Sequence, residues 1–262
     1  MRKRIITILV LSQCLGLAAQ DLSQDFKNWY LGSLTLRMTP NTSLSLGHLS
    51  SFDLQGYPHK FQQSRMTLNH KLGKQWRLSG GYSYSIIRGN TSLTPYHRME
   101  VQLEHRFKLG HWRFSNRIRA EKYFPQLTKF GSRYVYTQKW QYYNRNWPLR
   151  LSPFIRHQLF YYQGGKELKY WLAPEDIEEG GEDFILGATN GLHRYRLSLG
   201  ARMRLHSRLY LSLFYTYQRE FNTGLSPYTA LNVPNRSGSR IRRPFNNYSL
   251  FGLSLAYTLK LY

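Results

Sequence analysis

The fold is decided most clearly by residues 97–107, which read HRMEVQLEHRF. The odd positions are mostly apolar or aromatic, and the even positions are all polar or charged. A repeat of two that persists over about ten residues is typical of a β-strand with one apolar and one polar face. This stretch therefore predicts a long strand that separates two different environments.

The same period recurs throughout the chain, and the connections between the repeating segments are alternately short and long. The other predicted strands are 28–38, 42–51, 63–71, 76–87, 112–124, 133–143, 149–162, 194–205, 209–221 and 247–262. No linker or change of pattern divides the sequence, so we expect one domain over residues 21–262.

Strand length separates a soluble β-sandwich from a membrane barrel. Strands of globular sheets usually have about 5–6 residues, whereas a transmembrane strand needs about 9–11. Tryptophans near strand ends favour the barrel, since aromatic girdles lie at the membrane surface; they are Trp29, Trp76, Trp112, Trp140 and Trp147, which we place at or beside the short turns. We predict an all-β, antiparallel, transmembrane up-and-down barrel.

The strand number is harder to derive, because eleven candidates are an odd number and bacterial single-chain barrels have an even number. If the last strand ends in the periplasm, the strand over 28–38 would begin outside the cell. Either a twelfth strand lies in the loops or the N-terminal segment pairs irregularly. We prefer 12 strands, with 10 possible.

The N-terminus predicts export. Basic residues at positions 2–4 precede an apolar run over 5–11 and small residues at 16–19, which is the order of a secretory signal peptide. We expect residues 1–20 to be removed, with cleavage after Ala19 or Gln20. The alternative is a lipoprotein signal that uses Cys14, although Gln13 stands where a small residue is needed.

Composition excludes several classes of protein. The chain carries 37 Lys and Arg against 14 Asp and Glu, a net charge of +23, and one cysteine. A single cysteine excludes a disulfide framework, and no apolar run is long enough for a membrane-spanning helix. Because an exported chain rarely meets nucleic acid, the basic charge does not predict a nucleic-acid binder, and we expect no cofactor and no metal.

The cost of placing arginine in lipid assigns the two faces. Nine arginines lie on the polar faces of 98–106, 113–119 and 194–204, and facing lipid they would cost on the order of 20 kcal/mol, more than the stability of a typical domain. The polar faces should therefore line the lumen. The predicted pore-lining basic residues are Arg77, Arg98, Arg106, Arg113, Arg117, Arg119, Arg133, Arg156, Arg194, Arg196, Arg202 and Arg204, together with Arg37, Arg65 and Lys139.

A strongly basic lumen predicts passage or binding of anions, because a low-dielectric wall concentrates solutes of opposite charge. The predicted solutes are small anions, acidic oligosaccharides among them, with inward aromatic rings that could stack on sugars: Tyr143, Phe154, Tyr162, Tyr210 and Phe214. The alternative is a non-conducting structural barrel, since small barrels are filled by their own side chains. In that case Glu100, Glu104, Glu121 and Glu220 would pair with arginines across the ladder.

Two loops concentrate opposite charges. The acidic outer loop carries Glu175, Asp176, Glu178, Glu179, Glu182 and Asp183, and its spacing matches no EF-hand, which favours a solvated lid over a metal site. The basic loop carries Arg236, Arg240, Arg242 and Arg243, which would meet lipopolysaccharide phosphates or pair with the acidic loop.

A surface lipid or lipid A hydrolase is a third hypothesis. His48 with Ser50 or Ser51, and His97 with Ser92, are conceivable pairs on the wall. No HExxH or GxSxG motif supports them, so we name no catalytic residue.

Three stretches give the chain a family resemblance. They are residues 26–29 (FKNW), residues 116–121 (NRIRAE) followed by 133–136 (RYVY), and residues 193–218. With them the chain resembles a family of Gram-negative outer-membrane barrels known only as domain of unknown function 2490. The resemblance implies a barrel in the bacterial outer membrane and no established activity; the acidic loop has no counterpart that we can match. Size and an arginine-lined interior are also similar to oligogalacturonate-specific porins, though no motif supports that likeness.

The expected partners follow from this location. They are outer-membrane lipid, lipopolysaccharide and, through the amphipathic last strand that ends at Tyr262, the barrel-assembly machinery.

Overall fold

A computed structural model describes residues 25–53, 61–88, 93–144, 146–172, 181–222 and 227–262. The predicted signal peptide lies outside the described residues. So do Glu175, Asp176, Glu178 and Glu179 of the acidic loop, and Ser92.

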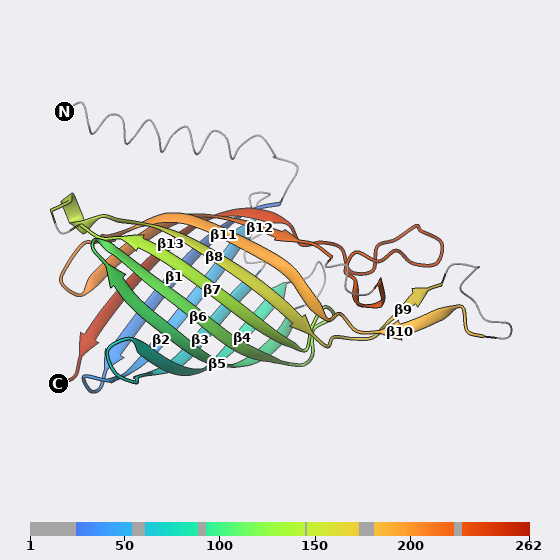
Figure 1. Cartoon of the computed structure of the whole chain (residues 1–262), viewed down its shortest axis with the longest axis horizontal. Coiled ribbons are helices and arrows are strands. Elements are labelled where there is room, and N and C mark those ends of the chain that lie inside the picture. Colours follow the sequence, from blue (N-terminus) through green and yellow to red (C-terminus); the bar gives the residue numbers. More distant parts are fainter. Residues whose placement is uncertain (1–24, 54–60, 89–92, 145, 173–180, 223–226) are drawn as a thin grey trace, which may run out of the picture.

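Within the described ranges, eleven long strands close into a barrel and two short strands form a separate hairpin beyond one end of it (Figure 1). The barrel strands are β1 (Asp25–Arg37), β2 (Thr42–Asp53), β3 (Phe61–Lys71), β4 (Trp76–Arg88), β5 (Leu93–Leu109), β6 (Trp112–Phe124), β7 (Ser132–Tyr142), β8 (Ser152–Gln163), β11 (Gly191–Arg204), β12 (Leu209–Glu220) and β13 (Tyr248–Lys260). The hairpin consists of β9 (Leu168–Trp171) and β10 (Phe184–Gly187).

The predicted all-β barrel of 10–12 strands is confirmed, and each of the eleven predicted strands appears. The preferred number of twelve is one more than the described barrel contains. The irregular pairing that we considered for the N-terminal segment accounts for the odd number. β1 runs parallel to β13, from Asp25 opposite Tyr248 to Arg37 opposite Lys260, while the other neighbours pair antiparallel.

Burial distinguishes the two faces of the wall. On β5, Met99 and Val101 are 58% and 59% exposed, whereas Glu100 and Glu104 are 4% and 2% exposed. Successive side chains of a strand point to opposite faces, so the apolar stripe points outward and the charged stripe points into the barrel. This is the arrangement that the cost of arginine in lipid predicts.

The two ends of the barrel differ in the length of their connections. The end at the left of Figure 1 has the short turns, where Gly73 and Gly110 adopt φ of 101° and 56°, a region that suits glycine. The other end, which we call the outer end, has the long connections and the β9–β10 hairpin, and the opening of the barrel there is called the mouth.

The tryptophans divide between two environments. Trp76, Trp112, Trp140 and Trp147 are exposed at or beside the short turns, as predicted. The prediction for Trp29 is wrong, because it lies near the outer end of β1 and packs inside the barrel.

Helices are few in the described part of the chain, and both are short 3-10 turns, Pro148–Arg150 and Pro227–Thr229. None of the described helices is long and apolar enough to cross a membrane.

An aromatic cluster occupies part of the interior. Phe154, Phe214, Tyr248 and Leu250 are buried together, with Trp29 and Leu31 packed against them. Two glycines make room for the rings: a Cβ at Gly200 would lie 2.8 Å from Cζ of Phe154, and one at Gly252 would overlap the ring of Phe214.

We expect Gly252→Ala to lower the free energy of unfolding of the barrel by about 1–3 kcal/mol, because the added methyl group collides with the ring of Phe214. Gly80→Ala is the matched control, since its Cβ would meet nothing within 4 Å. Thermal unfolding of the folded protein in detergent measures both variants. Equal midpoints for the two would contradict the packing described above.

Candidate functional site

The interior of the barrel is built in rows, because inward residues of neighbouring strands lie directly opposite one another. One row places Glu100 opposite Glu121, Glu121 opposite Arg133, and Arg133 opposite Tyr162. Rows closer to the short turns follow at intervals of two residues along each strand.

Glu121 is the centre of the largest ion cluster among the described residues, and its side chain is fully buried. Its oxygens lie 2.6 Å from Arg133, 2.8 Å from Arg119 and 3.4 Å from Arg98. The Tyr123 hydroxyl also donates to it at 2.9 Å. One carboxylate therefore holds three guanidinium groups in the barrel.

Two further inward carboxylates form ion pairs, and one of them shares Arg98 with Glu121. Glu100 pairs with Arg65 and, at 3.0 Å, with Arg98. Glu104 pairs with Arg106 at 2.6 Å and with Arg117 at 3.3 Å, and it accepts a hydrogen bond from Ser115. Of these ion pairs, only Glu104 with Arg117 joins directly opposite residues of adjacent strands, as expected of a structural barrel. Glu100 with Arg98 and Glu104 with Arg106 pair along β5, and Arg65 on β3 reaches Glu100 past β4.

Glu220 organises the outer end of the lumen. It pairs with Arg194 and with Lys129, and it accepts hydrogen bonds from the Tyr162 hydroxyl and the backbone N–H of Asn246. Burial lowers the pKa of the Lys129 ammonium, although Glu220 acts in the opposite direction. The loops at 125–131 and 244–247 are thereby tied to the wall.

An apolar plug lies beside Glu220. Leu231, from the last long connection, is fully buried in a cluster of inward side chains and loop residues: Tyr123, Phe130, Val135, Phe160 and Tyr162. The Asn222 side chain holds the backbone of Leu231 through both its N–H and its carbonyl, at 2.7 Å and 2.9 Å. A loop thus closes part of the mouth with a packed hydrophobic contact.

The twelve predicted basic residues divide equally in the described structure. Those that pair with carboxylates are Arg98, Arg106, Arg117, Arg119, Arg133 and Arg194. Those with no ion pair to a described carboxylate are Arg77, Arg113, Arg156, Arg196, Arg202 and Arg204. Apart from Arg196, this second group lies toward the short-turn ends of its strands.

Aromatic rings take the place of carboxylates for several of these cations. Arg202 lies 4.0 Å from the ring centre of Tyr210, and Arg113 lies 4.1 Å from that of Tyr143. Such contacts stabilise a cation without neutralising it. The rings that we expected to stack on sugars are therefore already in contact with cations, which sequence reasoning did not anticipate.

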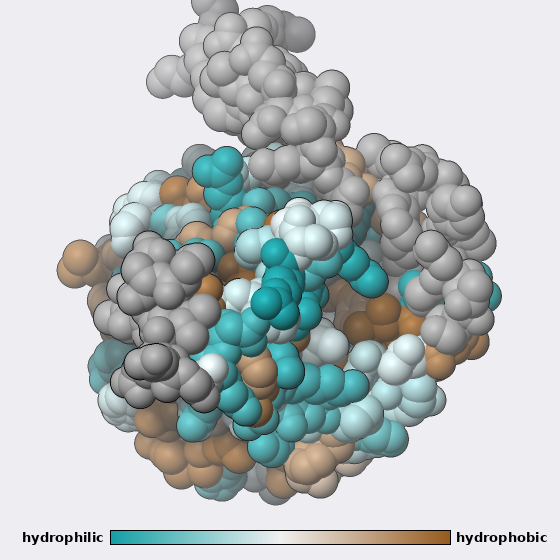
Figure 2. All heavy atoms as spheres, turned by 90° about the vertical axis from the view of Figure 1, so that its right-hand side faces the viewer, coloured by the Kyte–Doolittle hydropathy of each residue, from teal (hydrophilic) through white to brown (hydrophobic). Residues whose placement is uncertain are grey.

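The basic and acidic loops contact each other, and one of the basic residues is buried. Arg236 pairs with Asp183 at 2.8 Å, so the basic and acidic loops do meet. Arg243 is buried and donates to the Thr189 hydroxyl and to the carbonyl of Lys166, so it does not belong to an exposed basic patch. Hydrophilic side chains gather across the middle of this end, and hydrophobic ones lie along parts of its margin (Figure 2).

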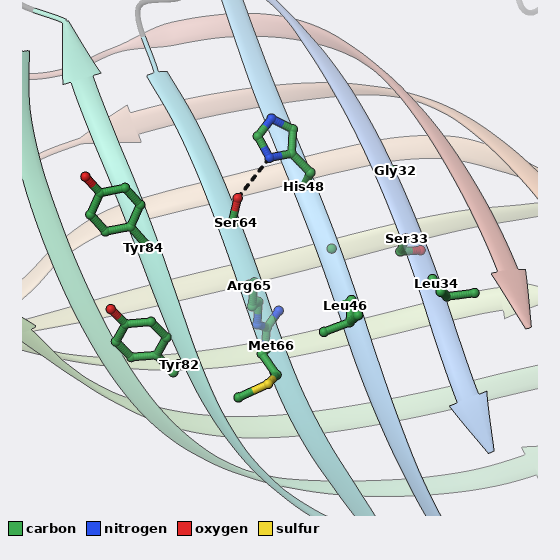
Figure 3. A pocket seen from close by; sticks show the side chains of 11 residues that line it. Gly32, Ser33, Leu34, Leu46, His48, Ser64, Arg65, Met66, Tyr82 and Tyr84 are labelled. Carbon is green, nitrogen blue, oxygen red and sulfur yellow. Dashed lines mark hydrogen bonds between the residues drawn. The ribbon is translucent and has the colours of Figure 1, made fainter. Parts of the chain in front are cut away.

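The lipid-facing side of the wall has a shallow, mainly apolar hollow that crosses β1 to β4 and is lined by Gly32, Leu46, Met66, Tyr82 and Tyr84 (Figure 3).

His48 stands at one end of this hollow, where its Nδ1 lies 3.0 Å from the Ser64 hydroxyl and its Nε2 lies 3.2 Å from that of Ser50. Both ring nitrogens are thus occupied by hydroxyls, which leaves none for the orienting carboxylate of a triad. Ser51 is buried on the opposite face, and His97 contacts the Tyr82 hydroxyl.

We expect Glu121→Gln to lower the free energy of unfolding by about 3–5 kcal/mol, because it leaves three enclosed arginines without their common carboxylate. Glu182→Gln, in the exposed loop, is the control and should leave stability unchanged. Guanidinium unfolding of the folded barrel compares them. A loss below about 1 kcal/mol for Glu121→Gln would show that the network is dispensable.

Comparison with known proteins places the chain in a family. Among solved structures it is similar to a NanC porin, with 11% sequence identity, a TM-score of 0.47, and coverage of 90% of this chain and 99% of that one. No curated protein matches the sequence. The model of the family described as protein of unknown function (DUF2490) matches residues 26–228, which confirms the resemblance noted above. The chain belongs to the DUF2490 family.

Proposed function

We propose that the chain is exported by its N-terminal signal peptide and spans the bacterial outer membrane, where it forms a passive channel or uptake pore for small anionic solutes. The apolar outer band supports the location. Val101, Ile118 and Leu213 are 59%, 61% and 47% exposed on that band, and a soluble monomer rarely exposes a contiguous apolar surface of such extent. The long strands, from 11 residues in β3 to 17 in β5, are long enough to cross the hydrocarbon core.

The observation that carries the function is the excess of inward cations over carboxylates. Glu100, Glu104, Glu121 and Glu220 each pair with two or three basic groups. Six of the predicted arginines form no ion pair with a described carboxylate. A low-dielectric wall focuses the field of such charges and draws anions inward. Planar guanidinium groups match carboxylate, sulfate and phosphate, so acidic oligosaccharides are one candidate class.

A second function is favoured by the packing at the mouth. The Leu231 plug and the ion pairs of Glu121 and Glu220 occupy part of the lumen, and a non-conducting structural barrel would be filled by side chains in this way. Under the channel proposal, the same plug is the part of the pore that must move.

The proposed partners follow from the location. The apolar band would contact outer-membrane lipid, and exposed Arg240 and Arg242 would contact lipopolysaccharide. The amphipathic strand β13 would engage the barrel-assembly machinery.

We expect the folded protein to give conductance steps in planar bilayers, with a reversal potential that shows anion preference across a salt gradient. The physical reason is the uncompensated positive charge of the lumen. Cation preference would refute anion passage. Silence from folded protein would favour the structural barrel.

We expect Leu231→Ala to increase the frequency or size of conductance steps, because it removes the side chain that packs the loop into the mouth. Leu186→Ala, on the exposed β9–β10 hairpin, is a control of the same chemistry and should leave conductance unchanged. If both variants conduct like the natural sequence, the plug does not obstruct the path.

A further inference from the structure

One inward row of the lumen places two cations directly opposite each other. In this row Ser115, Lys139, Arg156, Ser198 and Thr216 lie opposite one another on β6, β7, β8, β11 and β12. Lys139 and Arg156 are direct cross-strand neighbours, and like charges in that position repel. No carboxylate within the described ranges forms an ion pair with either.

Some hydrogen-bond donors of this row have no acceptor among the described residues. Arg156 donates from Nη2 to the Ser198 hydroxyl at 3.1 Å, but its buried Nε has no hydrogen-bond partner. The Ser198 oxygen also accepts a hydrogen bond from Thr216 at 2.8 Å. Because this oxygen already accepts two hydrogen bonds, the proton of Ser198 is left to donate elsewhere. The Lys139 ammonium lies 4.3 Å from the ring centre of Phe154, and it forms no hydrogen bond with a described residue.

In the next row toward the outer end, several polar side chains form hydrogen bonds with one another. There Gln158 donates to Thr137 at 3.2 Å, and Arg196 donates to Gln218 and to the Tyr248 hydroxyl. Glu104 lies in this same row, opposite Arg117. It is already shared by Arg106, Arg117 and Ser115, and no ion pair joins it to Lys139. Buried Nε atoms without a hydrogen-bond partner also occur at Arg65, Arg98, Arg117 and Arg119, but each of these arginines forms an ion pair with a carboxylate. Arg156 differs from them because no described carboxylate pairs with it.

We propose that Lys139, Arg156 and Ser198 form a binding site for the oxyanion group of a small solute, such as a phosphate, sulfate or carboxylate group. Two cations and a hydroxyl on three adjacent strands supply charge-assisted hydrogen bonds to one such group. The rings of Phe154 and Phe214 lie beside the cations, the latter 5.7 Å from the guanidinium of Arg156. They would contact an apolar part of the solute.

Binding of an oxyanion would also offset the electrostatic repulsion between the two cations of the row. Lys139 and Arg156 are half-buried, so water screens their repulsion only in part. An oxyanion between them converts a repulsive pair into two attractive contacts. The identity of the natural solute rests on the proposed function, but binding can be measured without any passage through the barrel.

The test is titration of the folded, detergent-solubilised barrel with inorganic phosphate and with acetate, by isothermal calorimetry at constant ionic strength in chloride. We expect one saturable site, tighter for phosphate because it carries more charge. Lys139→Gln, Arg156→Gln and Ser198→Ala each remove one donor, and each charge removal should weaken phosphate binding at least about tenfold.

Matched controls remove the same charges from the outer face. Lys122→Gln on β6 and Arg219→Gln on β12 are exposed there and should leave the phosphate affinity unchanged. Equal losses in the controls and in the row variants would indicate general attraction to a basic protein and would overturn the site.

Thermal unfolding gives a second readout. Phosphate should raise the midpoint of the natural protein, since a ligand that binds the folded state stabilises it. Lys139→Gln should be at least as stable as the natural protein without phosphate and should respond little to it. A lower midpoint for that variant in phosphate-free buffer would contradict the repulsion argued above.

The outcomes separate this inference from the proposed function. Absence of saturable phosphate binding to the natural protein overturns the site, whatever bilayer recordings show. Saturable binding that is lost in the row variants, from a barrel without anion preference, supports the site and overturns the proposed passage.

Discussion

The structure depends on one constraint, which is the cost of exposing guanidinium groups to hydrocarbon. A closed wall satisfies it by turning one side of every strand inward. Met99 and Val101 then face outward, while Arg98 and Glu100 are enclosed. The same alternation that forms the fold thereby creates a basic interior, and the chemistry of the chain follows from how that interior is neutralised.

Neutralisation is uneven along the lumen. Toward the outer end, Glu121 and Glu220 bind several cations each, and a loop adds the apolar plug around Leu231. Toward the short turns, Arg202 and Arg113 contact aromatic rings instead of carboxylates. The enclosed surface therefore passes from a packed, charge-paired region to one with excess positive charge, and the proposed oxyanion site lies where the carboxylates end.

The long connections serve the interior as much as the surface. Lys129 reaches Glu220, and Asn222 holds Leu231 in the mouth. Arg243, which by composition alone belongs to an exposed basic patch, is buried against Thr189. A solute that enters from outside would meet these loops before it met the arginines, so the channel and the structural barrel differ in the mobility of this plug more than in their charges.

The alternation seen at 97–107 and repeated along the chain was enough to predict the strands, because a period of two is a local property of each strand. Strand length then predicted the barrel, and the cost of arginine in lipid predicted the inward direction of the arginines. Sequence did not reveal the parallel pairing of β1 with β13, the inward position of Trp29, or the β9–β10 hairpin, since these depend on how distant segments meet. It also could not tell which arginines have partners. Arg133 and Arg156 look alike in the sequence, but the register between neighbouring strands places Glu121 beside the first and Lys139 beside the second.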